Sequence, residues 1–135
     1  MREELIFASV AWVDAARDIL EELASQHGEP GRKYSCCERF TDAPAELSAT
    51  GIVAWHFRID GTAVTVQRGD VTDVDLLVTA DYAATLPMAR LIYTPEILAQ
   101  QQEEGPPPHV TMEGDRSKSP PYLIELHNRL AAVTA

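Results

Sequence analysis

Side chains that could do chemistry are few in this sequence, and they are scattered. The four histidines, His27, His56, His109 and His127, are far apart, and none forms a pair at helical spacing. The sequence also lacks a glycine-rich phosphate loop and a Gly-x-Ser-x-Gly nucleophile motif. The sequence therefore predicts no catalytic residue and no catalytic metal.

Two groups of carboxylates have spacings that occur in functional sites. Asp70, Asp73 and Asp75 begin like a calcium-binding loop, but such a loop needs a glycine at its sixth position and a glutamate at its twelfth, and both are missing. Glu113 and Asp115 flank a glycine, where paired carboxylates could exchange protons with a substrate. A solvated turn is the simpler interpretation of both groups.

The only two cysteines, Cys36 and Cys37, are neighbours in the chain. In a strand their side chains would point to opposite faces, with one facing inward as a small apolar group. No further cysteine is present to complete a metal site. We therefore expect structural packing, with no metal and no cofactor.

Charge and hydropathy limit the partners of the chain. The formal net charge of −10 repels phosphate backbones and anionic lipid headgroups. No segment has the roughly 18 consecutive apolar residues of a membrane span, and the N-terminus lacks a basic leader. These features predict one cytoplasmic domain over residues 1–135 that neither binds nucleic acid nor inserts stably into a membrane. The sequence does not decide whether the chain forms a homodimer.

A stretch of alternating residues supplies the framework for any site. Residues 52–59 place apolar side chains on one face, as a half-buried strand requires. Asp60-Gly61 then suits a two-residue hairpin turn, residues 62–68 alternate again, and residues 74–80 form a third apolar run. The pattern predicts an antiparallel meander over about residues 51–80.

Helices are predicted on both sides of this stretch. Apolar residues recur at three- and four-residue spacing over about residues 3–26, and Gly28 is placed to end that helix. Residues 81–104 read as two helices, because Pro87 interrupts the first and Thr94-Pro95 begins the second. A weak strand at residues 32–40, a last strand at 109–113 and a C-terminal helix at about 120–134 complete an α+β fold. Its single, mainly antiparallel sheet would be covered on one face by helices.

The pattern of these elements resembles a known family. The run WHFRIDGTAVTVQRGDVTDVDLLVTADYAATLPMAR, followed later by EEGPPPHVTMEGD, is similar to the sterol carrier protein-2 (SCP2-like) lipid-binding domain. Shared features are the aromatic strand, the glycine turn, and a strand of the form D-x-x-V-T-x-D that opens a helix at Asp81. The resemblance implies a five-stranded sheet whose helices enclose a hydrophobic tunnel. It also implies a ligand among fatty acids, acyl-CoA, sterols or other lipids.

The leading functional hypothesis is therefore non-catalytic binding and carrying of a hydrophobic small molecule. Large apolar side chains near the helix breaks are expected to line the tunnel, namely Phe57, Tyr82, Leu86, Ile92, Ile97, Met112 and Leu126. Two alternatives stay open. One is a small enzyme acting on a hydrophobic substrate, with a carboxylate or His109 as base. The other is an interaction or dimerisation module with a filled core.

Overall fold

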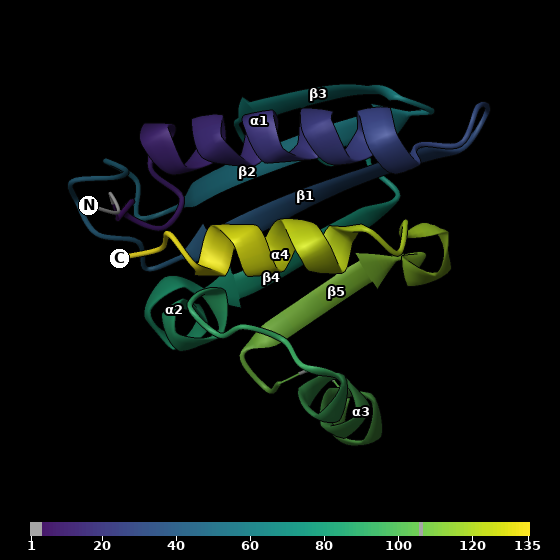
Figure 1. Cartoon of the computed structure of the whole chain (residues 1–135). Helices are drawn as coiled ribbons and strands as arrows, with labels where there is room; N and C mark the ends of the chain where they lie inside the picture. The colour runs from purple at the N-terminus through teal and green to yellow at the C-terminus, as the bar shows by residue number, and fades with distance from the viewer. Residues whose placement is uncertain (1–3, 106) are drawn as a thin grey trace.

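The computed structural model describes residues 4–105 and 107–135, which form one sheet with helices on one of its faces (Figure 1). The strands are β1 Lys33–Thr41, β2 Val53–Asp60, β3 Ala63–Arg68, β4 Leu76–Asp81 and β5 Val110–Gly114. The helices are α1 Val10–His27, α2 Tyr82–Ala89, α3 Pro95–Glu104 and α4 Leu123–Ala131, with a short 3-10 helix, η1 Arg116–Lys118, before α4.

The five strands are arranged in the order β3-β2-β1-β4-β5, so the weakly patterned β1 is the central strand. Three of the four strand pairs are antiparallel, and β1 and β4 are parallel. The α+β fold with a mainly antiparallel, five-stranded sheet is thus confirmed. The predicted meander is wrong in its third strand, because β4 pairs with β1 and not with β3. Only the β2–β3 hairpin follows the predicted order.

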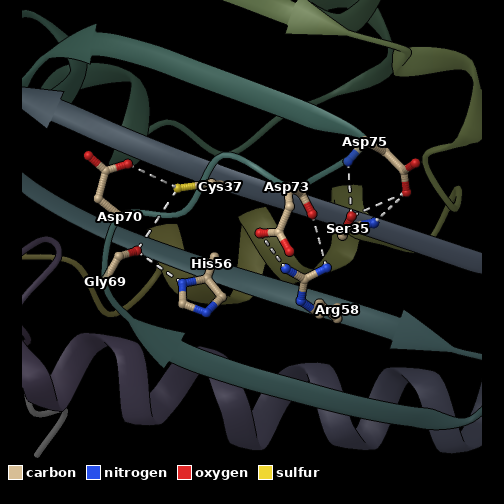
Figure 2. A network of polar contacts seen from close by, with 8 residues as sticks. All are labelled: Ser35, Cys37, His56, Arg58, Gly69, Asp70, Asp73 and Asp75. Atoms are coloured by element: carbon tan, nitrogen blue, oxygen red, sulfur yellow. Dashed lines mark hydrogen bonds and ion pairs between the residues drawn. The ribbon is translucent and has the colours of Figure 1, made fainter.

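The connection between β3 and β4 explains this pairing. Residues 69–75 cross β2 and β1 on the sheet face opposite the helices (Figure 2). Asp70 binds Arg39 of β1 at 2.6 Å, and Asp73 binds Arg58 of β2 at 3.0 Å. The aspartates that resembled a calcium loop therefore hold the crossing to the two strands beneath it. Among the described residues, no cluster of three or more acidic, histidine or cysteine side chains could hold a metal ion.

The last aspartate of the connection sets the register of the parallel pair. The Asp75 carboxylate accepts a hydrogen bond from the Ser35 backbone N–H at 2.9 Å, and the Ser35 hydroxyl accepts one from the Asp75 N–H at 2.9 Å. Both bonds lie one residue before the first parallel pair, Cys36 and Leu76. The Asp75 side chain thus extends the ladder and satisfies a buried backbone donor.

The helix α1 begins later than predicted, at Val10 and not near residue 3. Ser9 caps it by accepting a hydrogen bond from the Trp12 N–H at 3.2 Å, and Ala8 has a φ of 64°, which a right-handed helix does not allow. Leu5 instead forms a bridge with Thr134. Gly28 follows the helix as predicted, and a Cβ there would collide with the Gly61 carbonyl.

The C-terminal helix α4 is shorter than the predicted 120–134. It starts at Leu123 because Pro120 precedes another proline, which disfavours helical backbone at that position. It ends at Ala131, since Thr134 pairs with Leu5. The other boundaries agree closely with the sequence prediction. The side chains of Asp81 and Thr94 cap α2 and α3 as expected.

The core lies between the sheet and the helices α1 and α4, and it is rich in aromatic rings. Trp12 of α1 packs edge-on against Trp55 of β2, with ring centroids 5.3 Å apart. The indole N–H of Trp12 also donates to the Thr134 hydroxyl at 3.1 Å, which links α1 to the C-terminal segment. Within the part of the chain that the structure describes, no helix is long and apolar enough to span a membrane.

Asp75 and Asp73 allow a matched test of the crossing. Asp75→Ala leaves the Ser35 N–H buried without its acceptor, so we expect a loss of about 1–3 kcal/mol in the free energy of unfolding. Asp73→Ala removes only an exposed ion pair and should cost less than about 0.5 kcal/mol. Urea unfolding measures both values. Equal losses in the two variants would show that Asp75 does not set the start of β4.

Candidate functional site

A cavity of about 810 Å³ lies between the helix-covered face of the sheet and the helices. Its volume is in the range of small-molecule sites in proteins. The central strand β1 contributes a continuous row of inward-facing side chains, and β2, β4 and β5 extend this wall sideways. The helices α2, α3 and α4, with Trp12 of α1 and the segments next to these helices, supply the remaining wall. No residue of α3 is buried, so α3 is an exposed part of the wall.

Four of the seven residues predicted to line a tunnel are in this wall: Phe57, Ile97, Met112 and Leu126. They come from β2, α3, β5 and α4, so the fold brings together positions that are far apart in the sequence. The wall places them where a ligand could touch them. Contact with a ligand stays a prediction for each.

The other three predicted residues lie outside the cavity wall. Tyr82 is buried in the core, where its hydroxyl donates to the Phe7 carbonyl at 2.7 Å. Leu86 packs against the core from α2, and Ile92 is 46% exposed in the segment between α2 and α3. Proximity of a large apolar side chain to a helix break thus predicts the cavity wall only in part, because side chains near a break can also lie in the core or in solvent.

The wall holds two carboxyl groups that the sequence analysis missed, that of Glu104 at the end of α3 and that of Glu38 on the sheet. Glu38 lies in the middle of β1, opposite Trp55 of β2 and Val78 of β4. The indole N–H of Trp55 donates to one Glu38 carboxyl oxygen at 2.7 Å. The other carboxyl oxygen has no hydrogen-bond partner among the described residues. Glu38 is in phase with Tyr34, Cys36 and Phe40, and this acidic residue is one reason why the apolar alternation of β1 is weak.

Burial dominates the electrostatics of this wall. It raises the pKa of the Glu38 carboxyl, and the hydrogen bond from Trp55 opposes the rise only in part. Burial likewise raises the pKa of Cys36 and of Tyr34, which face the same cavity. No lysine or arginine is among the described residues that line it. The basic side chains among the described residues of the wall are therefore the histidines His109 and His127, and its acidic ones are Glu38 and Glu104.

Two further polar atoms in the wall are buried without a partner among the described residues. They are the Thr85 hydroxyl oxygen of α2 and the Nε2 atom of His109, just before β5. His127, by contrast, is engaged, because its Nε2 atom lies 2.8 Å from the Leu91 carbonyl and its ring stacks on Tyr93. Burial lowers the pKa of His127, which favours the neutral ring.

The remaining sequence candidates do not form a second site. Cys37 faces away from the cavity, under the β3–β4 connection, while Cys36 faces inward as expected. A smaller hollow of about 490 Å³ lies between the end of α1 and the start of α4. Its arginines are paired with carboxylates, Arg32 with Glu29 and Arg129 with Glu125.

The sheet order, the helices on one face and the position of the cavity define a sterol carrier protein 2-like fold. A crystal structure of sterol carrier protein 2 matches over 95% of this chain and 99% of its own, with a TM-score of 0.58 and 14% identity. A solution structure from Thermus thermophilus, described as a conserved hypothetical protein and possibly sterol carrier protein, has a TM-score of 0.52. It shares 14% identity over 97% of this chain and 96% of that one.

At such identities the likeness establishes the fold alone. No protein-family model matches the chain, and no curated protein matches it. The resemblance drawn from the strand and turn pattern is therefore confirmed as a resemblance of fold.

The raised pKa of Glu38 predicts a particular pH dependence of stability. Between the ordinary glutamate pKa of about 4.3 and the higher value in the folded state, the folded chain binds more protons than the unfolded one. The free energy of unfolding therefore falls as pH rises through that window, by at most about 1.4 kcal/mol per pH unit.

Glu38→Gln removes the titrating carboxyl and keeps an oxygen for Trp55. The free energy of unfolding of this variant, relative to that of the parent chain, should therefore increase from pH 4 to pH 8. Glu113→Gln, an exposed change on the opposite face of the sheet, is the control. Chemical unfolding at several pH values measures the difference. A constant difference between the Glu38→Gln variant and the parent would contradict the assigned burial.

Proposed function

We propose that this protein binds a hydrophobic small molecule in the cavity and carries it without changing it chemically. The observation that carries the proposal is the cavity itself, walled mainly by apolar side chains from four strands and four helices. Each Å² of apolar ligand surface removed from water contributes about 25 cal/mol, before the entropy cost of binding. An apolar molecule suits this wall better than a small polar one.

The fold supports the same proposal. The most informative structural neighbour is called sterol carrier protein 2, and the sequence pattern resembles lipid-binding domains of that type. We infer a ligand from the lipid class, such as a sterol, a fatty acid, an acyl-CoA or a related compound. The cavity also favours a binding protein over an interaction module with a filled core. A cytoplasmic location and a homodimer stay predictions.

Ile97→Trp tests whether the cavity is the binding site, and Ile92→Trp is its matched control. Ile97 lies in the wall, whereas Ile92 is exposed and outside it. Overpacking an apolar site costs about 1–3 kcal/mol, so the ligand affinity of Ile97→Trp should fall by about tenfold or more. Ile92→Trp should bind like the parent chain.

The measurement is the amount of compound that solvent extraction recovers per mole of each purified protein, identified by mass spectrometry. A lipid that co-purifies with the parent and with Ile92→Trp, but not with Ile97→Trp, supports the proposal. A parent chain that carries no compound and takes up no added lipid would contradict it.

A second candidate function is catalysis of proton transfer on a hydrophobic substrate. One observation favours it, namely the Glu38 carboxyl with a raised pKa inside an apolar cavity, a setting suited to a general base. The extracted compound distinguishes the two functions. A carrier yields compounds that are not related as substrate and product, even if Glu38→Gln selects a different ligand from the parent. An enzyme yields its product from the parent and unconverted substrate from the variant.

A further inference from the structure

The feature that simple apolar binding does not explain is the free oxygen of Glu38. A carboxyl group in an apolar environment is unfavourable unless it is hydrogen-bonded. Trp55 satisfies only one of the two oxygens, at 2.7 Å. A valine or leucine at this position would fit the neighbouring Trp55 and Val78 without that cost. The free oxygen is therefore an acceptor held inside the cavity.

The position of Glu38 on the central strand places this hydrogen-bond acceptor inside the cavity. Across the sheet, the residues of its row are Arg68, Trp55, Glu38, Val78 and Met112. The last four line the cavity, whereas Arg68 on the edge strand β3 is exposed and does not. Glu38 lies on the central strand, so it is flanked by apolar side chains on both sides. A ligand polar group that meets it must enter the cavity and cannot stay in solvent.

The charges around Glu38 select among polar groups. An anionic head, such as a fatty acid carboxylate, would face a like charge, and the described wall has no lysine or arginine to balance it. A cationic ammonium would have an opposite charge, but it would lose far more hydration than a neutral group on entering the cavity. An uncharged hydroxyl loses little hydration and can donate to a carboxyl oxygen.

We propose that the cavity takes an apolar molecule with an uncharged hydroxyl group, which donates a hydrogen bond to the free oxygen of Glu38, and that it rejects fatty acid anions. This inference rests on the proposed function and narrows its ligand class. The Trp55 indole fixes the orientation of the carboxyl, so that the second oxygen is the one presented to the ligand. Glu38 is then the residue that determines ligand specificity.

The two tryptophans of the chain provide the readout, because Trp12 and Trp55 both line the cavity. Their intrinsic fluorescence therefore responds to an occupant. The full-length, delipidated chain is titrated at pH 8 with dodecan-1-ol, with dodecanoate and with dodecane, each kept below its aggregation limit. The three probes share one alkyl chain and differ only in the head group.

The comparison between variants isolates Glu38 from the general hydrophobicity of the probes. In Glu38→Gln the like charge is removed, and the amide oxygen stays with Trp55 while its NH2 group faces the ligand. Dodecanoate affinity should therefore rise by about tenfold or more. Dodecan-1-ol affinity should change by less than about threefold, because its hydroxyl oxygen can accept from the NH2 group. In Glu38→Leu the acceptor is removed, so dodecan-1-ol affinity should fall by about tenfold. The exposed control Glu113→Gln should leave every affinity unchanged. Far-UV circular dichroism checks that each variant is folded.

The outcomes separate the two proposals. If dodecanoate binds the parent and Glu38→Gln equally, its head group does not meet Glu38 and the inference is overturned, while lipid binding stands. The same conclusion follows if Glu113→Gln shifts dodecanoate affinity as much as Glu38→Gln does. If none of the three probes alters the fluorescence of the parent, the proposed function fails, and this inference fails with it.

Discussion

The arrangement of this protein depends on a connection that crosses its own sheet. The β3–β4 segment leaves an edge strand, passes over β2 and β1, and places β4 beside the centre. Asp70 binds Arg39 of β1. Figure 2 shows Asp73 binding Arg58 of β2 and Asp75 continuing the ladder of β1 through Ser35. Because the crossing occupies one face, the helices pack on the other, and the cavity lies between them and the sheet.

The central strand β1 therefore combines apolar packing with one ionisable side chain. It is hydrogen-bonded on both sides, so its inward side chains form the middle of the core. Three of these side chains, Tyr34, Cys36 and Phe40, suit that position because they are largely apolar. Glu38 does not, since it brings an ionisable group to a half-buried position in a wall that is mainly apolar. A carboxyl at this position weakens the folded state and places an acidic group among the apolar side chains of the sheet.

Local features of this fold could be predicted from the sequence, because short-range chemistry determines them. The helix caps Asp81 and Thr94, the turn after Asp60 and the strand alternation of β2 each depend on a few neighbouring residues. The parallel pairing of β4 with β1 could not be predicted, because contacts between distant residues, such as Asp75 with Ser35, determine it.

The site was predictable only in part, for a related reason. Phe57, Met112 and Leu126 lie in the wall because strand and helix periodicity turns them inward. Tyr82 has the same periodicity, but it lies in the core and not in the cavity wall, because its hydroxyl donates a hydrogen bond to the Phe7 carbonyl. Glu38 was missed because an acidic residue in a weakly alternating strand indicates an exposed position. Only the register with Trp55 reveals that it faces inward.

The exposure of α3 has a consequence for exchange between the cavity and solvent. This helix forms one side of the wall through Ile97, yet none of its residues is buried and it lies apart from the α1 and α4 pair (Figure 1). Local opening costs least where few apolar contacts must break. Movement of α3 can therefore uncover the cavity while the sheet stays folded. The rate at which an occupant leaves would then be governed by this one helix and not by the stability of the whole domain.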